Sequence, residues 1–325
     1  MMKSVPVCLV FLVFLALALP GMAEEIIVYE ASPIHMPSAG GWVAVDQGFY
    51  GNLNIGQVQG ELGASPVQKV TAAVKAKAIA FGIDSPENIL LVREKEGVDL
   101  IAVGVDFQDS AMRIMSWKPI RSAKDLRGNF GIWPGYAIKA KCAVGKGWEK
   151  QFMIQNQEED IRPWLAGKWP LASAMTYDEL ILAQRELKKM GKTFYTIDYK
   201  DLGINWMDHV LFTTEEVIKK YPDVVQAVVG GRYKGFKWAL QNPKETFEIL
   251  KKVNESLDFG REMDAVGPVK FLMFTPETKK HGLGYVHPKK WGNVARDLIK
   301  GGLLEKMPDT TKIYTEKFPS GVMPK

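Results

Sequence analysis

Cysteine is scarce in this 325-residue chain, which contains Cys8 and Cys142. Cys8 lies inside an apolar N-terminal run, so removal of that run would leave Cys142 as a single thiol. One thiol cannot form an internal disulfide, and no cysteine pair remains to hold a zinc ion. The sequence therefore excludes a disulfide-stapled domain and a zinc module built on paired cysteines.

A strong excess of charge and the common catalytic motifs are also missing. The 42 basic and 37 acidic residues give a net charge of +5, and the basic residues are scattered, so no nucleic-acid partner is predicted. No Gly-x-Ser-x-Gly motif is present, and Gly145-Lys-Gly147 lacks the spacing and the following Ser or Thr of a phosphate loop. His281 and His287 flank a glycine-containing turn, which is a weak metal hint, and we predict no metal site.

The chain has one long apolar run, from Val5 to Leu19. Lys3 precedes this run, Pro20 ends it, and Gly21-Met-Ala23 offers the small residues of a cleavage site. These features predict a secretory signal peptide over residues 1–23, with a retained signal anchor as the alternative. We therefore expect a soluble, exported protein located in the periplasm.

Short apolar segments alternate with capped helices in the remaining chain. Ser65-Pro66 and Ser85-Pro86 each place a cap residue and a proline where a helix begins. Strands are expected at residues 25–30, 54–60, 78–83 and 100–105. This alternation predicts a mainly parallel α/β sheet.

A second α/β block interrupts the first, because crossover strands are expected near residues 112–117 and 205–212. The predicted fold is α/β with two lobes, two crossover strands and a helical C-terminal region. Lobe 1 is expected over residues 24–111 and 207–325, and lobe 2 over residues 112–206.

The stretch from Leu171 to Gln184 predicts a buried strand followed directly by a helix. Thr176 and Glu179 have the spacing of a capping box, as do Thr213 and Glu216 further on. Ligands of open α/β sheets bind beyond the carboxyl ends of the strands, so Tyr177 is placed either to touch one or to pack on a neighbouring loop. Glu179 either contacts the ligand or only caps the helix.

Three segments together resemble one protein family: Val43-Ala-Val-Asp-Gln-Gly-Phe-Tyr50, Lys124-Asp-Leu-Arg-Gly128 and Ala174-Met-Thr-Tyr-Asp-Glu179. They resemble the periplasmic substrate-binding proteins of ABC importers for sulfonates, nitrate and thiamine pyrimidine precursors. The resemblance implies a type II periplasmic binding protein that closes on a small-molecule ligand between its lobes. It also implies a permease partner in the cytoplasmic membrane, a monomer, no cofactor and no enzymatic activity.

The residues expected to bind the ligand lie at strand ends, crossovers and helix N-termini. They are His35, Ser65, Asp84, Ser85, Gln108, Trp133, Tyr136, Tyr177, Glu179 and Trp206. Among these, Asp84 follows a buried strand while Ser85 fills the next helix cap, so its carboxylate is either free for a ligand or hydrogen-bonded within the loop.

Three ligand or reaction classes stay open. Carboxylates and aromatic rings favour a small planar nitrogenous heterocycle, such as a thiamine pyrimidine precursor. Helix N-termini near Gly63–Ser65 and Gly135 would suit an anion such as an alkanesulfonate, taurine or nitrate. A related pyrimidine-synthase-like enzyme is the third possibility, but it depends on a cysteine-rich metal motif that this chain lacks.

Overall fold

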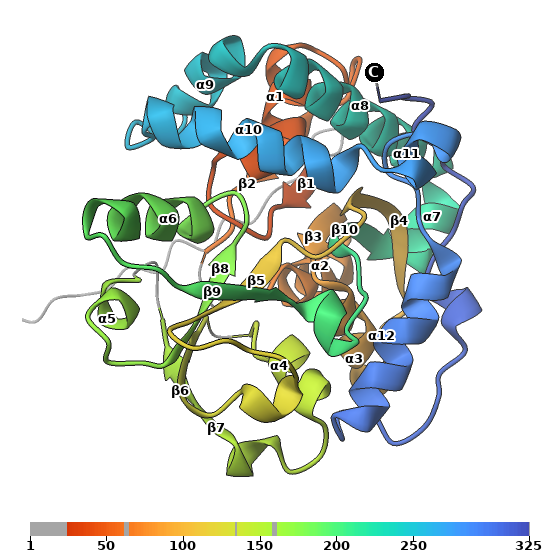
Figure 1. Ribbon diagram of the computed structural model, residues 1–325. Coiled ribbons are helices and arrows are strands. Elements are labelled where there is room, and N and C mark those ends of the chain that lie inside the picture. The colour runs from red at the N-terminus through yellow and green to blue at the C-terminus, as the bar shows by residue number, and fades with distance from the viewer. Residues whose placement is uncertain (1–24, 62–64, 134, 158–160, 325) are drawn as a thin grey trace, which may run out of the picture.

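The computed structural model describes residues 25–324 except 62–64, 134 and 158–160. The predicted signal peptide and Gly63 lie outside these residues. Within them, the strands form two five-stranded sheets, each flanked by helices (Figure 1).

The first sheet has the strand order β2-β1-β3-β10-β4. Its strands are β1 (Ile26–Tyr29), β2 (Ile55–Val58), β3 (Ile79–Asp84), β4 (Leu100–Phe107) and β10 (Asp208–Thr214). Strands β1, β2 and β3 run parallel, whereas β10 runs antiparallel to β3 and β4. Every residue of β3, β10 and the edge strand β4 is buried, as expected for strands covered on both faces.

The second sheet has the order β7-β6-β8-β5-β9. Its strands are β5 (Met112–Ser116), β6 (Gly128–Ile132), β7 (Phe152–Asn156), β8 (Leu171–Met175) and β9 (Tyr195–Asp198). Strand β6 is parallel to β7 and β8, and β5 is antiparallel to β8 and β9.

The chain passes from the first sheet to the second between β4 and β5, and it returns between β9 and β10. We call the part built on the first sheet lobe 1, the part built on the second sheet lobe 2, and the linking residues 108–111 and 199–207 the crossings. The predicted two-lobed α/β fold is confirmed. The lobe boundaries proposed from the sequence stay a prediction.

Helices cover both sheets (Figure 1). Those of the first sheet and the C-terminal region are α1 (Ala39–Asp46), α2 (Pro66–Lys75), α3 (Pro86–Glu96), α7 (Glu215–Lys220), α8 (Pro222–Gln241), α9 (Pro243–Lys251), α10 (Phe259–Met273), α11 (Pro276–His281) and α12 (Pro288–Lys300). Those of lobe 2 are α4 (Ile138–Val144), α5 (Arg162–Leu165) and α6 (Glu179–Lys189). Short 3-10 turns cover Met36–Ser38, Ala123–Asp125, Trp148–Lys150, Tyr199–Leu202 and Thr310–Lys312.

Helix α12 contacts both lobes, because it packs against α3 and against α4. Within the described ranges, no helix has the length and apolarity required to cross a bilayer. Cys142 on α4 is buried, and burial raises the pKa of its thiol above the usual range.

Both predicted capping boxes are wrong in detail. Helix α6 begins at Glu179, whose carboxylate accepts the N–H of Met175 at 2.9 Å, not that of Thr176. The Thr176 hydroxyl is buried and has no hydrogen-bond partner in the described part of the chain. Helix α7 is capped by Thr214, while the Thr213 hydroxyl donates to the Ala80 carbonyl of the neighbouring strand. In α6 the Glu179 carboxylate bonds one residue before the predicted one. In α7 the cap is one residue later than predicted, and the Thr213 hydroxyl bonds to the neighbouring strand instead.

Candidate ligand-binding site

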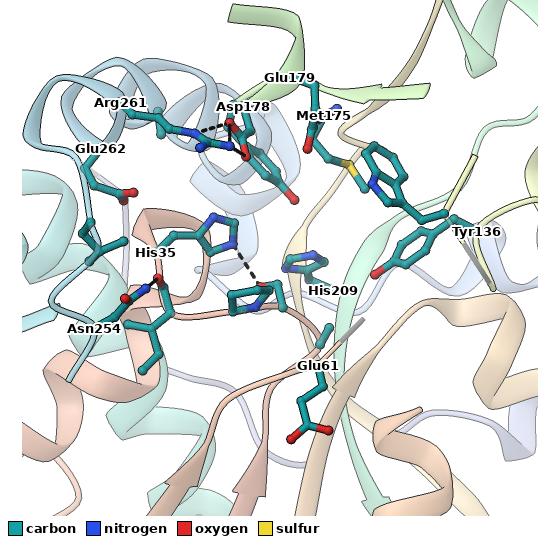
Figure 2. A pocket seen from close by; sticks show the side chains of 18 of the residues that line it. His35, Glu61, Tyr136, Met175, Asp178, Glu179, His209, Asn254, Arg261 and Glu262 are labelled. Atoms are coloured by element: carbon teal, nitrogen blue, oxygen red, sulfur yellow. Dashed lines mark hydrogen bonds and ion pairs between the residues drawn. The ribbon is translucent and has the colours of Figure 1, made fainter. Parts of the chain in front are cut away.

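A cavity of about 340 Å³ lies between the two lobes. Lobe 1 contributes the loops after β1 and β2, the end of β3, the second residue of β10, and residues 254–265 around the start of α10. Lobe 2 contributes the segments that follow β6 and β8. The carboxyl ends of the parallel strands therefore face one another across the cavity, as the fold predicts (Figure 2).

Seven of the ten residues predicted to bind ligand line this cavity: His35, Ser65, Asp84, Trp133, Tyr136, Tyr177 and Glu179. They come from both lobes and from five different strand ends or helix starts. The structure brings them together around one space, and their role in binding stays a prediction.

Three predicted residues lie outside the lining described for the cavity. Ser85 is the N-cap residue of α3, with its N–H bonded to the Asp84 carboxylate. The Gln108 amide donates to the Tyr285 carbonyl at 2.8 Å, and the Trp206 indole donates to Asp297 at 2.8 Å. Gln108 and Trp206 lie at the crossings, as their sequence positions suggest, but each side chain faces the C-terminal region.

Asp84 is not the free carboxylate that the sequence suggested. Its Oδ2 atom accepts the Ser65 hydroxyl at 3.0 Å and the Val67 N–H at 3.4 Å. Its Oδ1 atom accepts the Ser85 N–H at 2.7 Å and the Asn88 amide at 2.9 Å. Asp84 therefore links the N-termini of α2 and α3 at the wall of the cavity. The Ser65 hydroxyl bonds to Asp84 and does not itself cap α2.

Several lining residues were not anticipated. Arg261 and Glu262 belong to α10, and His209 belongs to β10. The Glu262 carboxylate accepts the Met36 N–H at 2.6 Å, which ties α10 to the 3-10 turn after β1. The sequence around α10 indicated a helix but gave no sign that its first turn would reach the cavity between the lobes.

Acidic groups dominate the charge of the cavity. Among its described lining residues the carboxyl-bearing ones are Glu61, Asp84, Asp178, Glu179, Asp258 and Glu262, and the guanidinium-bearing one is Arg261. The Arg261 guanidinium is already paired with the Asp178 carboxylate through contacts of 2.5 Å (Figure 2). The cavity therefore offers carboxyl groups more readily than a free cation.

Burial changes the protonation of these groups. Desolvation raises the pKa of Glu179 to about 7, with the nearby Asp178 charge acting in the same direction. Desolvation also raises the pKa of Glu262 to about 7. The pKa of His35 shifts in the opposite direction, to about 3. Burial is the main cause, and the charges of His209 and Arg261 lower this pKa further. At neutral pH Glu179 and Glu262 are thus near the midpoint of their titrations, and the imidazole of His35 is neutral.

Aromatic rings come mainly from lobe 2. Trp133 and Tyr136 meet edge to face with ring centroids 6.0 Å apart, and Tyr177 meets His35 of lobe 1 in the same manner at 5.8 Å. Phe107 lies behind Tyr177 at 6.0 Å. These rings form apolar walls, and flat ligands favour such walls because they can stack on them.

Metal binding has no support in the described residues, where no group of three or more His, Cys, Asp or Glu side chains is arranged to hold an ion. The acidic lining residues are instead distributed around the cavity.

Comparison with known proteins gives the family. The family model described as NMT1/THI5 like matches residues 36–246, well over half of the chain. The chain belongs to this family. The resemblance predicted from the three sequence segments is thereby confirmed.

Individual relatives are distant in sequence and similar in fold. The riboflavin-binding protein RibY of Chloroflexus aurantiacus is 23% identical over 292 residues, which are 86% of this chain and 82% of RibY. The aliphatic sulphonate binding protein SsuA from Escherichia coli has 14% identity and a TM-score of 0.62, with 93% of this chain and 94% of SsuA covered. The nitrate-binding protein NrtA from Synechocystis PCC 6803 has 10% identity and a TM-score of 0.64, with 91% and 87% covered. The NMT1/THI5-like chain therefore has the fold of periplasmic binding proteins.

Proposed function

We propose that the protein is the extracytoplasmic solute-binding component of an ABC importer and that it binds a small planar nitrogenous heterocycle between its lobes. In this proposal residues 1–23 direct export to the periplasm, a permease in the cytoplasmic membrane is the partner, and the protein acts as a monomer without a cofactor. Family membership and fold support the transport role, and the cavity supports the ligand class.

The charge of the cavity is the observation that carries the ligand class. Its carboxyl groups accept hydrogen bonds from the N–H and amino groups of a heterocycle, whereas the paired Arg261 is not free to bind an anion. Sulfonate or nitrate would meet like charge in a low-dielectric space and be disfavoured. Aromatic side chains such as Tyr136 and Tyr177 supply faces for a flat ring.

The comparisons are consistent with this choice and keep the anion as the second candidate. RibY is named for riboflavin, whose ring system is flat, contains nitrogen and includes a pyrimidine ring. SsuA and NrtA are named for sulphonate and nitrate, and they share the fold with this chain at 14% and 10% identity. A pyrimidine-synthase-like enzyme is a weaker alternative, because the mature chain contains a single cysteine.

Titration calorimetry distinguishes these candidates. Wild-type protein is titrated with riboflavin, an aminopyrimidine, taurine and nitrate under the same conditions. Binding of a heterocycle, with no heat from either anion, is the expected result. Binding of taurine or nitrate alone would reject the proposed ligand class.

Substitutions at Tyr177 test whether the heterocycle occupies this cavity. Tyr177→Ala is expected to weaken heterocycle binding by about 1–2 kcal/mol through loss of ring contact, while Tyr177→Phe keeps the ring and binds nearly as the wild type does. Tyr195→Ala, at an exposed tyrosine on β9, is the matched control and leaves affinity unchanged. Equal affinities for all three variants would place the ligand elsewhere.

A further inference from the structure

His209 has a backbone conformation that is unusual for its position. Among the described residues, the non-glycine residues with positive φ are Lys77 at 69° and His209 at 50°. Lys77 follows the C-terminal end of α2, where left-handed residues are common. His209 is the second residue of β10, where extended backbone is expected. This conformation is disfavoured for a residue with a side chain by a factor of about 5 to 30.

The backbone of His209 is held at the junction of the two lobes. Asp208, the first residue of β10 and the one that follows the second crossing, accepts the His209 N–H at 3.3 Å. The Asp208 carboxylate also accepts the Ser110 hydroxyl of the first crossing at 3.1 Å and the Lys139 ammonium of lobe 2 at 2.9 Å. All four residues are buried. The conformation of His209 is therefore tied, through Asp208, to both crossings and to lobe 2.

The side chain of His209 lines the cavity between the lobes. It stacks on Phe107 with centroids 4.6 Å apart and projects into the cavity between His35 and Tyr136 (Figure 2). No described residue hydrogen-bonds to its ring nitrogens. Burial lowers the pKa of His209, which leaves the ring with one N–H donor and one acceptor nitrogen.

The lobes are in contact in this structure. Asp178 at the start of α6 pairs with Arg261 on α10, and Arg185 on α6 pairs with Asp264 on α10. Figure 1 shows α6 and α10 lying side by side, which agrees with these ion pairs. The left-handed backbone of His209 is therefore observed in a structure whose two lobes are in contact.

We propose that His209 couples ligand occupancy to lobe closure: a polar edge of the ligand bonds to its ring and offsets the left-handed backbone that closure requires. Hinge residues absorb the change in φ and ψ between open and closed forms, and His209 returns to extended backbone when the lobes separate. The ligand contact rests on the proposed function, because it requires a hydrogen-bonding heterocycle. The backbone effect does not.

Small-angle scattering of ligand-free protein tests the backbone effect. Glycine adopts positive φ without a penalty, so His209→Gly is expected to shift the closed-to-open ratio about 5-fold to 30-fold toward closed. Its ligand-free radius of gyration falls below that of wild type. His209→Ala keeps the penalty and stays at the wild-type value, as does Lys77→Gly, the matched control at the other left-handed residue. A ligand-free His209→Gly protein with the wild-type radius would overturn the proposal.

Riboflavin binding tests the ring contact. His209→Ala is expected to bind about 2-fold to 10-fold more weakly than wild type, the range for one net hydrogen bond. His209→Gly lacks the same ring yet binds more tightly than His209→Ala, because it closes more readily. His209→Asn, which tolerates left-handed backbone and keeps hydrogen-bonding groups, recovers part of the affinity and replaces His209→Gly if that variant does not fold.

The outcomes separate this inference from the proposed function. If the His209→Gly variant binds riboflavin no more tightly than the His209→Ala variant, the proposed coupling between the ligand and lobe closure is overturned. Failure of wild-type protein to bind riboflavin would count against the ligand class, while the ligand-free scattering comparison would still decide the role of the His209 backbone.

Discussion

Arg232 is a fully buried cation of lobe 1 that contacts two carboxylates. Its guanidinium, on α8, bonds to Glu30 at 2.6 Å and to Asp106 at 2.6 Å, and all three side chains are at most 2% exposed. Arg232→Met is expected to destabilise the protein by about 3–5 kcal/mol, because both carboxylates lose their cation in a desolvated site. Urea unfolding measures the change.

Lys252 provides the control for that substitution. It pairs with Asp46 at 3.2 Å on the surface, so Lys252→Met is expected to cost less than about 1 kcal/mol. Similar losses in the two variants would show that the buried cluster contributes no more than a surface pair.

Glu262 makes stability depend on pH. Burial raises its pKa from 4.5 to about 7 in the folded protein, so the folded state holds the proton more tightly than the unfolded chain. The protonated Glu262 therefore stabilises the folded state. This stabilisation is complete below about pH 4.5 and is lost as the pH rises through about 7. The melting temperature is expected to fall over this range, and to fall less in Glu262→Gln. Glu245→Gln, at an exposed glutamate on α9, keeps the wild-type slope.

Residue patterns predicted where the cavity lies better than they predicted individual contacts. Tyr177, Asp84 and Trp133 were located because strand ends are visible in the sequence, and all three line the cavity. The partners of Asp84 were not visible, since Ser65 lies 19 positions earlier in the chain. Only the packing of α2 beside β3 brings them together.

Helices α6 and α10 both contribute residues to the cavity between the lobes, but only α6 has a clear sequence pattern. The strand and capped helix at residues 171–189 have a clear local pattern. Helix α10 lies in a C-terminal region whose pattern indicates helices without any tertiary placement. Its contact with α6 depends on how the two lobes pack against each other, which no local pattern encodes.

The Arg185–Asp264 pair between these helices is expected to slow ligand release. Arg185 is half exposed, so the pair is worth at most about 1 kcal/mol. Arg185→Gln should therefore raise the dissociation rate of riboflavin about 2-fold to 5-fold and leave the association rate nearly unchanged. Stopped-flow flavin fluorescence measures both rates. Lys189→Gln, which breaks a pair within α6 itself, serves as the control, and an equal effect there would argue against a link between the lobes.

At the scale of the whole molecule, the alternating strands and helices were enough to predict the two-lobed fold. Strands β5 and β10 each follow a crossing and run antiparallel to their neighbours, and each occupies the fourth place in the strand order of its sheet. Helix α12 was expected as part of a helical C-terminal region, but its contact with both α3 and α4 could not be inferred, because amphipathic pattern identifies a buried face and not its neighbour.

Ligand binding is expected to compact and stabilise the whole chain. Ligand at 100 times its dissociation constant adds about 2.7 kcal/mol to the free energy of unfolding and raises the melting temperature. Closure also lowers the radius of gyration, because the ligand contacts both lobes. Thermal melts and solution scattering with riboflavin measure the two effects. Stabilisation without compaction would indicate a rigid pocket instead of closing lobes.

The burial of Cys142 makes the protein suitable for conversion into an optical sensor. A chain without residues 1–23 lacks Cys8, so Cys142 is its single cysteine. The Cys142 thiol on α4 is buried and is held in its unreactive protonated form. A cysteine introduced at Lys188, an exposed position on α6 that faces the gap beside α10, would be the thiol that maleimide dyes reach. The dye would report lobe movement as a change in emission, without first removing the native cysteine.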